Sequence, residues 1–282
     1  MNLNTYHYTK NKQIYFFTFL ILFSFFIRLP VIFMFGDPDL QNEWKVLVEN
    51  LVLYKVLSFR VFEDIFVPNL WMPPLYVFYL YFFKIFNLSD SQYILTILFS
   101  QAFLASISVV LFYEINRLFF SKKISIFGTI LFSVFPLHVY ACSQISSISL
   151  QCFLTVLFVY CFFQITKNIK FKTICLFSLV SGLLILLRGE FLLISFLSFF
   201  YLYIFYRINI KKILLIICLT ILVISPYLIR NITSLNTISI TKTYGYNLWK
   251  GNNSNSGVSG SEIIDNENLQ NKKNNIPKNK FY

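Results

Sequence analysis

Residues 14–35 read IYFFTFLILFSFFIRLPVIFMF, a run in which Arg28 is the one charged side chain. An apolar run of about 20 residues is long enough to span a bilayer as a helix. It lacks the alternation of apolar and polar residues that a membrane β-strand needs. The short head before it carries Lys10 and Lys12, as a signal peptide also does. No small-residue cleavage site follows, so we expect an uncleaved anchor helix.

The composition excludes a water-soluble globule. Of the 282 residues, 57% are hydrophobic and 13% are charged, whereas a soluble domain carries about 25% charged residues. The net charge of +12 comes from short basic clusters between apolar runs, a pattern typical of membrane orientation rather than of nucleic-acid binding. The five cysteines lie in or beside apolar runs without C-x-x-C spacing, which indicates neither a zinc site nor a disulfide framework.

Charge predicts which apolar runs cross the membrane. Long runs follow the first one at 91–113, 124–141, 149–166, 173–187, 191–206 and 213–229, whereas the run at 73–86 has only 14 residues and reaches about 21 Å as a helix. If 73–86 is half-buried or re-entrant, the basic clusters all fall on the side of the N-terminus, as cytoplasmic loops require. They are Lys10, Lys12, Arg117, Lys122, Lys123, Lys167, Lys170, Lys172, Arg207, Lys211 and Lys212.

The predicted fold is therefore all-α: a polytopic membrane helix bundle with about seven crossings, a cytoplasmic N-terminus and an extracytoplasmic C-terminus. Residues 1–229 form the core, with outer loop 36–72. Residues 230–282 form a polar extracytoplasmic tail, and its Asn-rich end predicts a disordered or truncated segment.

The outer loop 36–72 holds six acidic residues against three basic ones. Its apolar residues have helical spacing, which predicts amphipathic juxtamembrane helices; they are Leu40, Trp44, Leu47, Val48 and Leu51. Asp37, Asp39 and Glu43 then lie at the water–lipid boundary, where a carboxylate can take a proton from an acceptor hydroxyl. Asp37 precedes Pro38, so helix capping is an alternative role for it.

The candidate cations are three arginines. Arg28 lies inside an apolar run and needs a partner or a route to the interface. Arg188 suits phosphate recognition, or it pairs with Glu190. Arg230 emerges with the last run and suits phosphate binding or helix anchoring. His138 has no metal-ligand spacing to other residues, and a structural or solvated role is expected for it.

Five stretches together resemble C-type integral-membrane glycosyltransferases, the group of protein O-mannosyltransferases and the aminoarabinose transferase of lipid A. They are EWKVLVENL at 43–51, MPPLYVF at 72–78, FPLHVY at 135–140, LLRGEFLL at 186–193 and SPYLIRNITSLNTISITKTYGYNLWKGNN at 225–253. The chain is similar to the N-terminal part of a longer family member.

The resemblance implies transfer of a sugar from a polyprenyl-phosphate donor to a glycan, lipid or protein acceptor on the outer face of the cell membrane. Asp39, Asp37 or Glu43 would be the base, and Arg188 and Arg230 would hold the phosphate. A divalent metal is an open possibility, although no carboxylate lies between Ala141 and Leu150 to form a two-carboxylate site.

Other functional classes stay open on sequence alone. A transporter or flippase is also polytopic and basic, but such proteins place ionisable residues near the bilayer midplane, and here the acidic residues gather in one loop. A non-catalytic accessory subunit is the third class. Aminoarabinose as the sugar is disfavoured, because Trp71 and Met72 stand where that group has Glu-Lys before the paired prolines.

Overall fold

The structure, a computed structural model, describes residues 3–40, 42–62, 65–68, 70, 72–242, 245, 248, 251 and 252. The end of the predicted tail, 253–282, lies outside the described residues.

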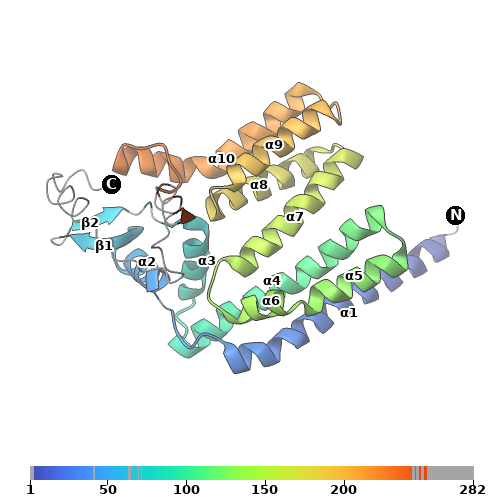
Figure 1. Cartoon of the computed structure of the whole chain (residues 1–282), viewed down its shortest axis with the longest axis horizontal. Coiled ribbons are helices and arrows are strands. Elements are labelled where there is room, and N and C mark those ends of the chain that lie inside the picture. The colour runs from blue at the N-terminus through green and yellow to red at the C-terminus, as the bar shows by residue number, and fades with distance from the viewer. Residues whose placement is uncertain are drawn as a thin grey trace.

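Seven helices form a bundle in which consecutive members run in opposite directions (Figure 1). They are α1 (Leu3–Phe35), α4 (Asp90–Phe119), α5 (Lys122–Val134), α7 (Ile148–Lys167), α8 (Phe171–Leu187), α9 (Phe191–Ile204) and α10 (Ile210–Leu235). Six of the seven apolar runs predicted from sequence each overlap one of them, whereas the run 124–141 is divided between α5 and the segment Pro136–Ser143. Helix α10 continues through the predicted boundary at 229/230, so the polar tail begins later than expected.

The bundle has two chemically different ends. The turns between α4 and α5, α7 and α8, and α9 and α10 lie at the end where α1 begins (Figure 1). We call this the basic end, because these turns carry the basic clusters. We call the opposite one the loop end, where the segment between α1 and α4 and the turns 141–148 and 188–190 lie.

The loop end holds short elements. Between α1 and α4 come α2 (Asn42–Tyr54), an antiparallel hairpin of β1 (Ser58–Phe62) and β2 (Ile65–Pro68), and α3 (Pro74–Lys84). The hairpin was not predicted. Helix α3 has 11 residues and is about 16 Å long, so it is too short to cross a bilayer core of about 30 Å. It lies beside α2 at the loop end (Figure 1). Its length agrees with the expectation that 73–86 does not cross, and its half-buried or re-entrant position stays a prediction.

The amphipathic helix expected in the outer loop is α2, but its apolar face is covered by protein. Leu47 and Val48 are fully buried, and the ring of Trp44 lies edge-on to the ring of Tyr76 in α3, with 4.9 Å between centroids. The apolar spacing of this helix therefore serves packing on α3.

Among the residues that the structure describes, length and composition make four helices able to span a membrane: Lys12–Phe35 of α1, α4, α7 and α10. A fifth span is possible if α5 and the segment Pro136–Ser143, which are bent by 51° from each other, are counted together. That segment contains α6 (Pro136–Tyr140) and the 3-10 turn η1 (Ala141–Ser143). Helices α8 and α9 are apolar but shorter, with 17 and 14 residues. The chain thus has the helices of a multi-pass membrane protein.

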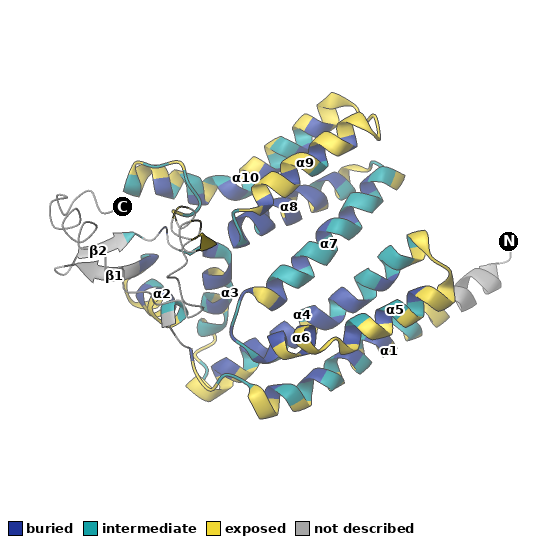
Figure 2. Ribbon diagram, in the orientation of Figure 1, coloured by how far each residue is buried: buried dark blue, intermediate teal, exposed yellow. Residues whose placement is uncertain are grey.

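The burial of residues along the helices also fits a membrane bundle (Figure 2). Helix faces that meet other helices are mostly buried. Many large apolar side chains are exposed, and those of Phe127 and Phe196 are more than 60% exposed. In water such surfaces would be costly, and in lipid they are not. The buried faces carry many small residues, including Ala102, Ala105 and Gly182, which allow the close helix approach that membrane bundles use.

Candidate functional site

Arg28 is fully buried inside the bundle, with 0% of its surface exposed, so it does not reach the interface. Its Nη1 donates to the carbonyl and hydroxyl oxygens of Ser24, at 2.7 and 2.5 Å, and to the Ser133 carbonyl at 3.3 Å. Its Nη2 donates to Nδ1 of His138 at 3.0 Å. Since arginine has no acceptor, His138 must accept at Nδ1 and carry its proton on Nε2.

The partners of Arg28 lie on both sides of a break in the chain. Pro136 has no N–H, α5 ends at Val134, and the last carbonyls of α5 lack helical donors. Arg28 supplies a donor to one of them and to the first helical turn after the break. A cation is also favourable at the negative end of a helix dipole. The sequence expectation of a structural role for His138 agrees with this geometry, and a solvated role does not, since His138 is 8% exposed.

Asp37 follows the end of α1 and binds the turn after η1. Its Oδ2 accepts a hydrogen bond of 2.6 Å from the Ile145 N–H, and its own N–H donates to the Ser143 carbonyl at 3.0 Å. The carboxylate is therefore engaged in holding segment 143–145 against α1. The alternative role expected from sequence, capping of the next helix, is not what the structure shows: α2 begins only at Asn42, and the carboxylate accepts the Ile145 N–H of a distant turn instead.

A buried amide network fixes the same turn from α3 and α4. Gln101 is fully buried; its Oε1 accepts from the Tyr76 hydroxyl at 2.9 Å, and its Nε2 donates to the Gln144 carbonyl at 2.9 Å. Gln144 in turn donates to the Phe35 carbonyl at the end of α1, at 2.9 Å. Burial raises the pKa of Tyr76 well above its usual value, and the nearby Asp37 carboxylate adds to the rise. Tyr76 is thus a neutral donor.

Asp39 is exposed and lines an open pocket of about 430 Å³ at the loop end. The pocket lies between α2 and the start of α4. Its charged rim is Asp39, Lys45, Glu49, Lys84 and Asp90, and Leu40, Val48, Tyr93 and Ile94 contribute to its apolar floor. A volume of this order is usual for small-ligand pockets.

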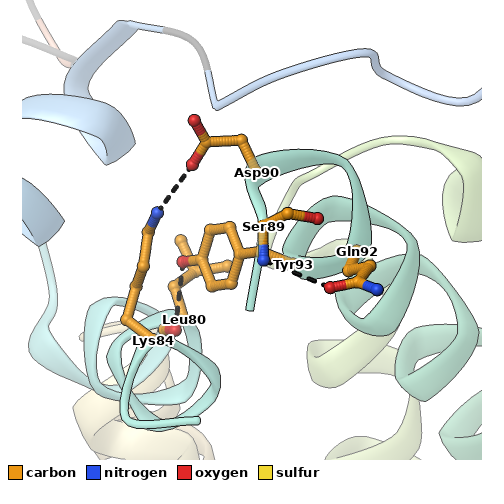
Figure 3. A network of polar contacts seen from close by, with 6 residues as sticks. All are labelled: Leu80, Lys84, Ser89, Asp90, Gln92 and Tyr93. Atoms are coloured by element: carbon orange, nitrogen blue, oxygen red, sulfur yellow. Dashed lines mark hydrogen bonds and ion pairs between the residues drawn. The ribbon is translucent and has the colours of Figure 1, made fainter. Parts of the chain in front are cut away.

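One wall of this pocket is braced by the polar contacts in Figure 3. Lys84 at the end of α3 pairs with Asp90 at the start of α4, with 3.2 Å between Nζ and Oδ1. The Lys84 ammonium also lies 4.3 Å from the centre of the Tyr93 ring, and the Tyr93 hydroxyl donates to the Leu80 carbonyl at 3.1 Å. The Asp90 side chain is 95% exposed, so the ion pair stabilises the fold only weakly. It places one positive and one negative charge side by side on the rim of the pocket.

Glu43 does not line this pocket. It lies in the first turn of α2, where a carboxylate stabilises the positive end of the helix dipole. Of the three acidic residues predicted as the base, Glu43 and Asp37 lie where they stabilise the fold, whereas Asp39 lines the pocket.

Arg188 ends α8 at the loop end. Its Nε is buried and has no hydrogen-bond partner, and among the described residues it forms no ion pair with Glu190. The mutual pair considered from sequence is therefore not formed. A buried N–H without a partner is costly unless water or a ligand satisfies it. Gly189 follows, and a Cβ there would lie 3.9 Å from Thr241, so the turn 188–190 lies beside the segment after α10.

Arg230 is half-buried near the end of α10 and already has protein partners. It donates to the Leu57 carbonyl and to Asn231, each at 2.8 Å. The contact with Leu57 ties α10 to the residue before β1, and the contact with Asn231 lies within α10. Their existence favours an anchoring role for Arg230. Arg188 and Arg28 each have a buried Nε without a partner, and of these two only Arg188 lies at the loop end.

No group of three or more His, Cys, Asp or Glu side chains in the described part of the chain is placed to hold a metal ion. Sequence reasoning missed Gln101 as a network centre. A glutamine more than two turns inside a long apolar helix was the available signal, because an uncharged polar side chain there needs partners.

Comparison of the chain with protein families, with characterised proteins and with solved structures finds no match.

Proposed function

We propose that this protein is a membrane glycosyltransferase that moves a sugar from a polyprenyl-phosphate donor to an acceptor hydroxyl at the loop end. The observation that carries the proposal is Asp39 on the rim of an open pocket at the end of an apolar helix bundle. The donor would keep its polyprenyl chain in the lipid beside the bundle, and the acceptor, a glycan, lipid or protein, would enter the pocket from outside.

In the proposed reaction, Asp39 takes the proton of the acceptor hydroxyl. The acceptor oxygen forms a bond to the anomeric carbon, and the bond from that carbon to the phosphate oxygen breaks with inversion. Polyprenyl phosphate leaves with the bonding electrons. Arg188 would donate to the departing phosphate, because its Nε has no hydrogen-bond partner in the structure and guanidinium groups bind phosphate well. Arg230 would support this charge from its position near the end of α10.

Asp37 has a positioning role in this proposal. Its carboxylate holds the turn at Ile145, and it lies two residues before Asp39 along the chain. The fixed loop would hold the base near the pocket.

The proposed membrane arrangement has seven crossings, with the basic end in the cytoplasm and the loop end outside the cell membrane. Cysteine labelling tests it: a reagent that cannot cross the membrane should label a cysteine at Glu190 in intact cells but not one at Lys122. Labelling of the cysteine at Lys122 alone would reverse the orientation and remove the proposed active face from the outside.

The catalytic proposal is tested with purified protein and a panel of radiolabelled polyprenyl-phosphate sugars, by scoring release of polyprenyl phosphate. General-base catalysis contributes about 10²–10⁴-fold, so Asp39→Asn should lower release by that factor. The matched control is Asp90→Asn, a carboxylate on the same rim that pairs with Lys84, and it should keep most of the activity. Full activity of Asp39→Asn would refute the base assignment. Absence of release with every donor, from folded protein, would refute the enzyme proposal.

A further inference from the structure

The basic end of the α7–α10 half carries a cluster of six cations. The cluster comes from two turns, which neighbour each other because the Phe162 ring of α7 lies 6.1 Å from the Tyr201 ring and 6.3 Å from the Tyr206 ring. We call it the six-cation cluster; its members are Lys167, Lys170, Lys172, Arg207, Lys211 and Lys212. Neither turn, 167–172 or 204–212, contains an acidic residue.

No acidic side chain among the described residues neutralises these six cations by an ion pair. None of them makes an ion pair or a side-chain hydrogen bond with a residue that the structure describes. Two helices, α8 and α10, also begin at these turns, and helix N-termini add positive potential. The combined charge attracts anions strongly and is concentrated in a small area.

One member of the six-cation cluster, Arg207, lines a pocket. An open cavity of about 490 Å³ is lined by Tyr203, Ile204, Arg207, Ile208, Asn209 and Ile210. Arg207 adopts a left-handed backbone conformation, with φ of 49°, and is exposed. Asn209 caps α10 by accepting from the Lys211 N–H at 2.9 Å. The pocket therefore joins one cation and a helix N-terminus to an apolar wall.

We propose that this pocket binds an anionic phospholipid, with the phosphate diester at Arg207 and Lys211 and the upper acyl chain against Tyr203, Ile204 and Ile210. Charge complementarity selects an anion, and the membrane leaflet next to basic turns supplies anionic lipid headgroups. The apolar wall distinguishes the occupant: a soluble phosphate or a nucleic acid would leave it uncovered, whereas a lipid covers it. The inference does not depend on the glycosyltransferase proposal, since it concerns the opposite end of the bundle.

The expected effect follows from direct contact with the phosphate. A hydrogen bond from a cation to the lipid phosphate contributes about ten-fold to binding. The double variant Arg207→Gln/Lys211→Gln should therefore weaken lipid retention by about 100-fold. The matched control is Lys122→Gln/Lys123→Gln, which removes the same charge at the basic end from two exposed lysines of the α4–α5 turn.

The experiment measures lipid retention by the full chain in mixed micelles containing equal amounts of dioleoylphosphatidylglycerol and dioleoylphosphatidylcholine, by native mass spectrometry. The proposal expects the unmodified protein to retain phosphatidylglycerol preferentially, the Arg207/Lys211 double variant to lose this preference, and the control to keep it. Equal loss in both double variants would mean diffuse attraction and would overturn the site. No preference in the unmodified protein would overturn it without reliance on any variant. Displacement of the lipid by millimolar inorganic phosphate would assign the pocket to a soluble anion instead.

Discussion

Replacement of Arg28 by lysine tests how the broken helix α5–α6 is held. Arginine reaches its targets with two separate nitrogens: Nη1 bonds Ser24 and Ser133, and Nη2 bonds His138. Lysine keeps the positive charge, but its side chain is shorter and ends in a single nitrogen instead of a forked guanidinium group. We expect it to keep the bonds to Ser24, one turn away in α1, and to lose the two bonds across helices.

The size of the effect follows from those two bonds. Hydrogen bonds between helices in a membrane contribute about 0.6 kcal/mol each, so the loss is about 1.2 kcal/mol, which is about eight-fold in a local opening equilibrium. The effect should be confined to the segment that Arg28 holds, because α4 and α7 keep their own packing. Hydrogen exchange followed by mass spectrometry should therefore show faster exchange at 136–146 and unchanged exchange in the middle of α4.

The control is Arg117→Lys, which changes an exposed arginine whose Nη1 donates to the Phe120 carbonyl in the next turn. It should leave exchange at 136–146 unchanged. If Arg28→Lys leaves 136–146 as protected as in the unmodified protein, the bonds across helices do not hold the break. If all helices lose protection together, Arg28 supports the whole bundle and not this segment.

Two further substitutions test the packing of the site. Asp37→Ala removes the acceptor of the Ile145 N–H and leaves a half-buried donor unmet, so thermal unfolding in detergent should show a loss of about 1–3 kcal/mol; an unchanged melting temperature would contradict the anchoring role. Gly182→Ala puts a Cβ 2.6 Å from the Val223 side chain of α10, and overpacking of this kind costs about 1–3 kcal/mol. The same change at Gly128, where the nearest atom is 3.5 Å away, should cost much less, and equal costs would show that α8 and α10 separate freely.

The helices were predictable because a bilayer leaves the backbone few choices. In lipid every N–H and C=O must bond within the segment, so an apolar run such as 149–166 is almost the same segment as α7, Ile148–Lys167. Helix ends were less predictable. Helix α10 runs on to Leu235, because polar residues beyond the apolar run can continue a helix in water, where hydropathy gives no signal.

The site was predictable in its residue types and not in its partners. Asp37, Asp39, Arg188 and Arg230 were identifiable as charges at the ends of apolar runs, and Arg28 as a charge inside one. Their roles were not, because Arg28 meets Ser133 and His138 across more than 100 residues of sequence, and such pairing depends on how helices pack. The sequence predicted one run at 124–141, whereas the structure breaks it before Pro136. The sequence also did not show that Arg28 of α1 would donate to the Ser133 carbonyl at this break.

Arg28 and Asp37 act on the same segment from one helix. They are nine residues apart, about 13 Å along a helix, and they bond to Ser133 and Ile145, which lie on either side of α6 and η1. Because one contact comes from α1 and the other from the second residue after it, the broken segment is fixed relative to α1 at two points. Asp39 belongs to the same short stretch after α1. A change at Arg28 should therefore alter the site through the position of Asp37 and not through charge, and Arg28→Lys should lower the turnover number more than it changes the KM for the donor.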